Sequence, residues 1–129
     1  MTILLDSTVL IDALRKEPRA VAALSRILRR GHMLATSVIN VGELYSGVRP
    51  HEIGSLEELL QHIDAQPVTF NIARRAGELR NNAARKGRTL ELDDMLVAAT
   101  ALELSLPVLT DNIKDFKSTG VELFDAGDN

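Results

Sequence analysis

Apolar and polar residues recur along this chain with two periods, and together these periods predict an α/β fold. Short apolar runs predict five strands, at residues 2–5, 33–36, 67–69, 107–110 and 121–124. Between them, apolar residues at every third or fourth position predict helices at residues 7–16, 18–30, 38–45, 56–63, 71–86 and 92–102. Because strands separated by helices are joined by crossovers, we expect a central, mostly parallel sheet of about five short strands flanked by helices.

Capping and breaking residues delimit several of these elements. Pro18 suits the first turn of the second helix, which Gly31 ends. Ser37 is placed to cap the helix after the second strand, and Gly87 closes the long helix that starts near residue 71. We see no repeat, linker or low-complexity segment. We therefore expect a single domain over residues 1–129, with a loose acidic tail from Asp125.

Composition narrows the class of protein further. With 129 residues, 45% hydrophobic and 26% charged, the chain can bury one core and is not globally disordered. A net charge of −3 argues against a uniformly basic nucleic-acid binder, although a local basic patch remains compatible with it. The lack of cysteine excludes disulfides and thiolate metal sites. No apolar stretch reaches the roughly 20 residues that span a bilayer, and no signal peptide is visible, so we expect a cytoplasmic protein without a membrane partner.

Three acidic residues stand in otherwise apolar surroundings. Asp6 directly follows the first apolar run, at the strand end where open α/β sheets bind ligands. Glu43 lies within an apolar helical segment, and Asp94 lies at the start of the most apolar helix. Unpaired carboxylates in such places destabilise the fold unless a cation or hydrogen-bond donors compensate. If the three acids converge, oxygen-only ligation favours Mg²⁺, or Mn²⁺, over zinc.

Each acid also has a purely structural interpretation. Asp6 alone is equally well explained as the N-cap of the helix that follows it. Glu43 is explained as a solvated helix position, which its apolar neighbours disfavour. One member of the pair Asp93-Asp94 is expected to cap its helix, and the sequence does not say which. The conjunction of three such acids carries more weight than any one of them.

Four segments, in this order, resemble motifs of PIN-domain nucleases, and within that group the VapC-type toxins of bacterial and archaeal toxin–antitoxin systems. They are ILLDSTVLID at 3–12, SVINVGEL at 37–44, DMLVAA at 94–99 and VLTDNIKDF at 108–116. The resemblance spans nearly the whole chain. It implies a PIN-like fold and metal-dependent hydrolysis of RNA with Mg²⁺, in which Asp6, Glu43 and Asp94 are the catalytic, metal-binding acids. It also implies a VapB-like antitoxin, whose tail lies across the active site, and a toxin homodimer.

The fourth acidic position of the family departs from its usual pattern here. That position is often an Asp two residues after the Thr that ends the fourth strand, and this chain has Asn112 there. Asn112 can still orient a water or a metal-bound group, and Asp111 or Asp115 could contribute through a shifted loop. Three hydroxyl residues stand where they can act as caps or hydrogen-bond the carboxylates: Ser7, Thr8 and Thr110.

The stretch from residue 74 to residue 88 holds six basic residues against the single acid Glu78. It is either a solvated helix face or a track that contacts RNA phosphates beside the acidic site. In the second interpretation, Arg85, Lys86 and Arg88 are the phosphate-contacting residues.

Two other classes of protein compete with the nuclease. A phosphorelay receiver shares the length and α/β alternation but needs paired acids after its first strand and a Lys after a later one, where this chain has Thr110-Asp111. A catalytically weakened PIN scaffold that binds RNA or protein is the closer alternative, and only Asn112 supports it. Metal titration with an RNA cleavage assay separates this scaffold from the nuclease.

Overall fold

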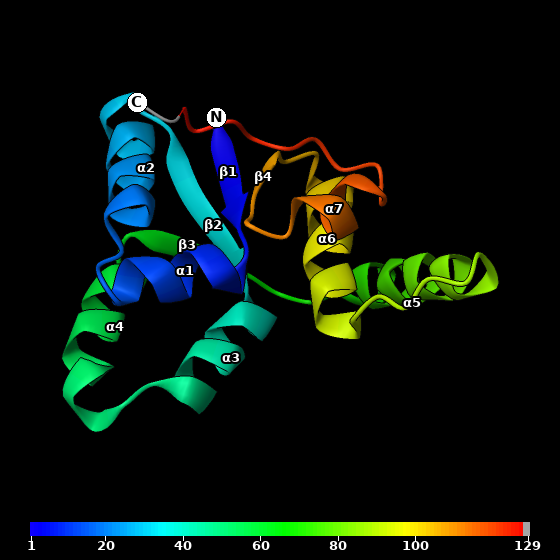
Figure 1. The fold of residues 1–129 in the computed structure, drawn as a ribbon, viewed down its shortest axis with the longest axis horizontal. Helices are drawn as coiled ribbons and strands as arrows, with labels where there is room; N and C mark the ends of the chain where they lie inside the picture. Colours follow the sequence, from blue (N-terminus) through cyan, green and yellow to red (C-terminus); the bar gives the residue numbers. More distant parts are fainter. Residues whose placement is uncertain (128–129) are drawn as a thin grey trace.

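The computed structural model describes residues 1–127 of the chain (Figure 1). Its elements follow in the order β1 (Thr2–Leu5), α1 (Ser7–Leu14), α2 (Pro18–Arg29), β2 (Met33–Ser37), α3 (Val38–Gly47), a 3₁₀ turn η1 (Pro50–Glu52), α4 (Ile53–Leu60), β3 (Ile63–Gln66), α5 (Phe70–Arg85), α6 (Leu92–Leu104), β4 (Val108–Leu109) and α7 (Ile113–Lys117).

The four strands form one parallel sheet in the order β3-β2-β1-β4. At the carboxyl end of β1, Leu5 is in register with Thr36 of β2 and with Leu109 of β4. Because all strands run the same way, the residues that follow β1, β2 and β4 emerge at one edge of the sheet. The predicted α/β class with a parallel sheet is confirmed.

Helices cover both faces of the sheet, α1 to α4 on one side and α6 and α7 on the other (Figure 1). Successive residues of a strand point to opposite faces. Ile3 and Leu5 therefore pack into a core with α1, α2, α3 and α4, whereas Leu4 packs against α6, β4 and α7. All three side chains are fully buried, so β1 is buried on both faces of the sheet. Helix α5 packs along α6 through a third apolar cluster.

Local sequence explains where the helices begin. The Ser37 hydroxyl accepts a hydrogen bond from the amide of Ile39, and the Thr69 hydroxyl caps α5 in the same way. Pro18 occupies the first turn of α2, and Gly31 follows that helix with a φ of +81°, which favours glycine. The predicted roles of Pro18, Gly31 and Ser37 are confirmed.

Two predicted strands differ in the structure. The third strand is Ile63–Gln66 rather than residues 67–69, and α4 accordingly ends at Leu60. Within residues 1–127 this strand pairs only with β2, and its side chains are largely exposed, so the apolar signal of a buried strand is missing. Residues 121–124 run beside β4 but form only one isolated bridge, between Val108 and Leu123. The sheet therefore has four strands where about five were expected.

The predicted loose tail from Asp125 is wrong as far as residue 127. Ala126 is buried in the core formed by α1, α2 and the sheet. The Arg26 guanidinium of α2 donates hydrogen bonds to the carbonyls of Ala126, at 2.9 Å through Nε, and of Gly127. Main-chain carbonyls supply these acceptors, so the side-chain pattern gave no sign of them.

Among the helices of residues 1–127, none combines the length and the apolar character that crossing a membrane requires.

Candidate active site

Asp6 stands where β1 ends and α1 begins, and both of its carboxylate oxygens are held. Oδ1 accepts a hydrogen bond from the amide of Thr8 at 2.6 Å, which makes Asp6 the N-cap of α1. Oδ2 accepts a hydrogen bond from the hydroxyl of Thr110, which follows β4. The side chain is only 1% exposed. The capping interpretation of Asp6 is therefore correct, and the same contacts fix its carboxylate at the carboxyl edge of the sheet.

Glu43, in the second turn of α3, faces Asp93 in the first turn of α6. Burial raises the pKa of Glu43 to about 7, helped by a hydrogen bond with Asp93 and by repulsion from Asp93 and Asp94. The Ser7 hydroxyl donates a hydrogen bond to Glu43 and lowers its pKa in part. A hydrogen bond between two carboxyl groups requires one of them to carry a proton. Helices α3 and α6 therefore bring the carboxyl groups of Glu43 and Asp93 so close together that both cannot be ionised at once.

Asp94, in the first turn of α6, lies near three other acids. Burial and then repulsion from Asp93, Asp6 and Asp115 raise its pKa to about 6. Asn112 counteracts this shift, because its Nδ2 donates to Asp94 Oδ2 at 3.3 Å and to Asp115 Oδ2 at 3.1 Å. The prediction that Asp93 or Asp94 caps α6 is wrong, since Glu91 occupies the N-cap and both aspartates lie in the first turn.

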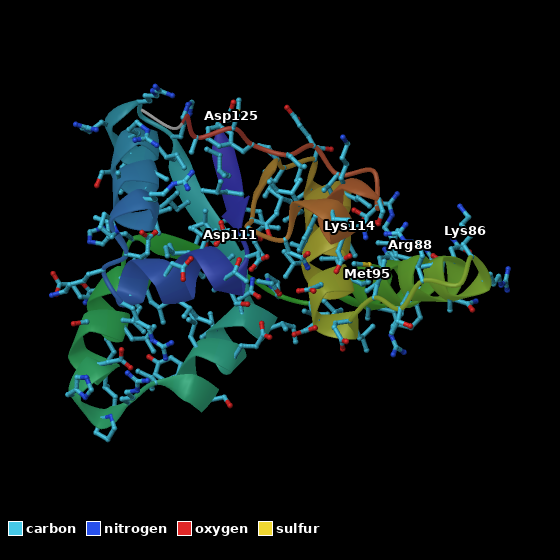
Figure 2. All side chains as sticks on the ribbon, viewed as in Figure 1. Lys86, Arg88, Met95, Asp111, Lys114 and Asp125 are labelled. Carbon is cyan, nitrogen blue, oxygen red and sulfur yellow. The ribbon has the colours of Figure 1, made fainter. Side chains whose placement is uncertain are left out.

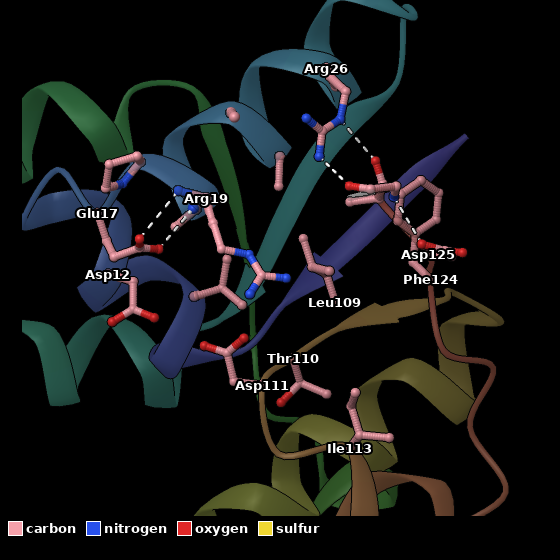
Figure 3. A pocket seen from close by; sticks show the side chains of 17 residues that line it. Asp12, Glu17, Arg19, Arg26, Leu109, Thr110, Asp111, Ile113, Phe124 and Asp125 are labelled. Atoms are coloured by element: carbon pink, nitrogen blue, oxygen red, sulfur yellow. Dashed lines mark hydrogen bonds between the residues drawn. The ribbon is translucent and has the colours of Figure 1, made fainter. Parts of the chain in front are cut away.

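The candidates for the fourth position lie in the loop between β4 and α7 and in the first turn of α7, and they face two different groups. Asn112 and Asp115 face Asp94, as the hydrogen bonds show. Asp111 is hydrogen-bonded instead to Asp12 of α1; burial, that hydrogen bond and the charge of Asp12 raise its pKa. Figure 3 shows Asp12 and Asp111 at a pocket of about 790 Å³ between α1, α2, this loop and the C-terminal segment. Asp111 therefore hydrogen-bonds away from Asp94, although the charge of Asp6 also raises its pKa.

The predicted hydroxyl residues connect these elements. The Thr110 hydroxyl donates to Asp6 and accepts from the amide of Asn112 at 2.9 Å. The Thr8 hydroxyl accepts from the amide of Asp111 at 3.4 Å. The start of α1 and the loop after β4 are thereby tied together around Asp6.

The structure thus brings Asp6, Glu43 and Asp94 into one electrostatically coupled group with Asp93 and Asp115. Asp93 was missed as a member of this group. The pair Asp93-Asp94 could have indicated this role in the sequence. A helix needs only one capping residue, so the second acid at the start of an apolar helix calls for another explanation. Within residues 1–127, no basic side chain contributes to the shifts of Glu43 and Asp94.

The donor set of this group fits a hard divalent cation. It consists of carboxylate oxygens and one amide, which are ligands that Mg²⁺ and Mn²⁺ accept. In the part of the chain that the structure describes, no three acidic or histidine side chains already converge closely enough to hold an ion. Carboxylate rotation would therefore have to accompany binding, with Glu43 and Asp93 giving up their shared hydrogen bond.

The basic residues of α5 are only partly available to a ligand. Arg75 pairs with Glu103 of α6 at 3.0 Å, and the Arg80 Nε donates to the carbonyl of Leu90 at 3.0 Å. Arg85 and Lys86 are exposed, and Arg88 is half-buried. Figure 2 shows Lys86 and Arg88 along the arm that α5 forms beside α6, outward from Met95. The predicted phosphate-contacting residues thus lie beyond the start of α6 rather than among the acids.

The fold is a parallel sheet covered by helices on both faces, and its carboxylates are grouped at the carboxyl edge. Comparison with known proteins identifies the family that has this arrangement. The profile of the PIN domain matches residues 3–122, and the chain belongs to this family. Two curated relatives from Mycobacterium tuberculosis confirm the resemblance to VapC-type proteins. Ribonuclease VapC19 is 34% identical over 88% of this chain and 90% of its own length. Ribonuclease VapC10 is 39% identical over 88% of this chain and 85% of its own.

A solved structure extends this similarity to the fold. The toxin–antitoxin complex from Klebsiella pneumoniae contains a chain that superposes on this one with a TM-score of 0.73 at 27% identity. The superposition covers 88% of this chain and 89% of that one. The predicted PIN-like fold is confirmed.

Proposed function

We propose that this chain is a metal-dependent endoribonuclease toxin, VapC-like, which hydrolyses phosphodiester bonds in RNA and is neutralised by a cognate antitoxin. One observation carries the proposal: Asp6, Glu43 and Asp94, from three separate elements, form a coupled acidic group at the carboxyl edge of a PIN-domain sheet. Relatives that are named ribonucleases support RNA as the substrate.

In this proposal, Asp6 and Asp94 would hold Mg²⁺, and Glu43 would contribute to the same site. When bound, Mg²⁺ supplies an activated water and neutralises charge on the phosphate. Asn112 fixes the Asp94 carboxylate and, by its second hydrogen bond, places Asp115 beside it. Asn112 is neutral and cannot supply a negative charge at the fourth position. Asp115 therefore serves as the fourth acid.

The protein's own groups orient the carboxylates and handle a proton. The amide of Thr8 and the hydroxyl of Thr110 hold both oxygens of Asp6, so this side chain does not need to reorganise when a ligand arrives. Glu43 has a pKa of about 7 in the metal-free protein, so near neutral pH it would release its proton when the metal binds. Glu43 would orient the attacking water, and Ser7 would hold the Glu43 carboxylate in place through its hydrogen bond.

The partners follow from the same proposal. The relative from Klebsiella pneumoniae is described as a toxin–antitoxin complex, which supports a VapB-like antitoxin for this chain. An acidic active site attracts basic side chains of such a partner. A homodimer remains part of the proposal, as the family resemblance implies.

Substitution of the two central aspartates tests the function. Asp6→Asn and Asp94→Asn should each lower Mg²⁺-dependent cleavage of RNA by roughly 100-fold or more, since each removes a charge that the metal requires. Cleavage is measured on a fluorophore-labelled RNA, with EDTA and Mg²⁺ readdition as the metal control. Glu58→Gln, on the exposed face of α4, is the matched charge-removal control and should retain wild-type activity.

Wild-type cleavage by either aspartate variant would contradict the assignment. If wild-type protein binds RNA in Mg²⁺ but does not cut it, the weakened, RNA-binding PIN scaffold is the correct alternative.

A further inference from the structure

A buried amide lies one helical turn before Glu43. Asn40, in the first turn of α3, is 1% exposed. Burying an amide is unfavourable unless its polar atoms find partners. An apolar residue would suit this position if packing were the only requirement, and Ser37 already caps the helix. The contacts that Asn40 makes therefore indicate what the residue does.

Asn40 closes a small hydrogen-bonded ring with the end of the sheet. Its Nδ2 donates to the carbonyl of Leu5 at 3.2 Å and to the hydroxyl of Thr36 at 2.8 Å. The Thr36 hydroxyl in turn donates to the same Leu5 carbonyl at 2.8 Å. All three groups are buried, and Thr36 is 0% exposed. Both amide hydrogens and the hydroxyl hydrogen are thus used, so the geometry of the ring is fully specified.

The ring joins the elements that carry two of the acids. The Leu5 carbonyl belongs to the peptide bond that leads into Asp6, so it shares a rigid plane with the Asp6 nitrogen. Glu43 lies three residues after Asn40 on the same helix, and residues at this spacing share a face. The contact between Asn40 and Leu5 therefore links the Asp6 main chain to the helix that carries Glu43.

We infer that Asn40, with the hydroxyl of Thr36, is a positioning residue: it sets the place of helix α3, and hence of Glu43, relative to Asp6. The inference rests on the proposed function, because the two acids are taken there to act on one metal-bound reaction centre. Asp6 is held independently by Thr8 and Thr110, so loss of the ring displaces Glu43 and leaves the Asp6 carboxylate in place.

Three variants separate positioning from packing. Asn40→Leu keeps the volume of the side chain but removes both donors. Thr36→Val keeps the shape of the other partner and removes its hydroxyl. The double variant removes both polar groups. Because no buried polar group then lacks its partner, the double variant should regain much of the stability that either single variant loses. Asn82→Leu, on the exposed surface of α5, is the matched control.

Each variant is assayed for thermal unfolding, for kcat and KM on a short RNA, and for Mn²⁺ affinity by calorimetry. Asn40→Leu should lower kcat roughly 10- to 100-fold with KM changed less than about 3-fold, and should weaken Mn²⁺ binding, as loss of an orienting partner does. Thr36→Val should act in the same direction to a smaller extent. The double variant should regain thermal stability without regaining kcat or Mn²⁺ affinity.

Recovery of kcat together with stability in the double variant would overturn the inference, because the residue would then act through stability alone. Wild-type kcat and Mn²⁺ affinity in folded Asn40→Leu would also overturn it. If that variant does not fold, Thr36→Val decides by the same criteria. Wild-type protein that neither cleaves RNA nor binds Mn²⁺ would instead refute the proposed function, which distinguishes the two failures.

Discussion

At the scale of single residues, structural and chemical roles coincide at Asp6. Its carboxylate caps α1 and accepts from Thr110, so the contacts that a helix start requires also fix the orientation of the acid. Glu43 and Asp94 are held less completely, and their raised pKa values record burial together with nearby negative charge. The site is therefore arranged around an oriented Asp6 and two acids whose charge depends on pH.

The raised pKa values predict how stability of the metal-free protein depends on pH. A carboxyl group that binds its proton more tightly in the folded state contributes stability at low pH, and this contribution is lost as the pH rises through the folded pKa. For Glu43 the window runs from 4.5 to about 7, and for Asp94 from 3.8 to about 6. The melting temperature in EDTA should therefore fall as the pH rises through this range.

The double variant Glu43→Gln, Asp94→Asn provides the comparison, because it cannot lose these protons. Its melting temperature should fall less with pH than that of the wild type. Saturating Mg²⁺ should also reduce the dependence in the wild type, since metal binding requires the ionised carboxylates. Equal pH dependence of wild type and variant would show that other groups control stability in this range.

At the scale of elements, the arm that α5 forms beside α6 carries basic residues away from Asp93 and Asp94 in the first turn of α6. Arg75 and Arg80 are engaged with Glu103 and Leu90, so the part of α5 nearest the sheet uses its cations structurally. Arg85 is the last residue of α5, and Lys86 and Arg88 follow it on the arm. An RNA strand that contacts them would have to run from the arm to the first turn of α6 to reach Asp94.

Replacing Arg85, Lys86 and Arg88 by Ala should weaken RNA binding and flatten its dependence on salt. Each phosphate contact to a single strand contributes about 0.7 to the slope of log K against log salt, so loss of three contacts should change the slope by roughly 2. The affinity of the Asp94→Asn variant for RNA, measured by fluorescence anisotropy at several salt concentrations, gives this slope without cleavage. Arg29→Ala with Arg30→Ala, on the exposed end of α2, is the control. An unchanged slope would indicate that α5 presents a solvated helix face.

At the scale of the whole molecule, the core on the α6 side of the sheet holds helix α7, which carries Asp115, and the loop before it, which carries Asn112. Phe116 is fully buried in this core with side chains from β1, β2, α6 and β4: Leu4, Ala35, Val97, Ala98, Ala101 and Val108. Phe116 directly follows Asp115, so packing of this ring anchors the loop as well as the fold.

Phe116→Ala should destabilise the protein by about 3–5 kcal/mol, because it removes a large buried side chain and leaves a cavity. Ile113→Ala is the matched control on the same helix, since Ile113 is 55% exposed. It should change stability by less than about 0.5 kcal/mol. Urea unfolding followed by circular dichroism measures the free energy of unfolding of both variants. Equal losses of stability in the two variants would contradict the burial of Phe116.

The sequence by itself determined the fold class, most elements and the three acids of the candidate site. Strand β1 and helix α6 are strongly apolar, so their burial is visible without tertiary information. Asp6, Glu43 and Asp94 stood out because a carboxylate among apolar neighbours needs compensation. Edge strand β3 was misplaced because its stability comes from pairing with β2, which leaves no apolar pattern in its own residues.

Only the tertiary structure decided which side chains share the site. Asp93 meets Glu43 across two helices, and Asn112 joins Asp94 to Asp115, while Asp111 turns toward Asp12. These outcomes depend on the direction in which each side chain leaves its element and on the distance to an element far away in sequence. The contact of Asn40 with Leu5 is of the same kind, because a polar side chain shows its role only when its buried partner is known.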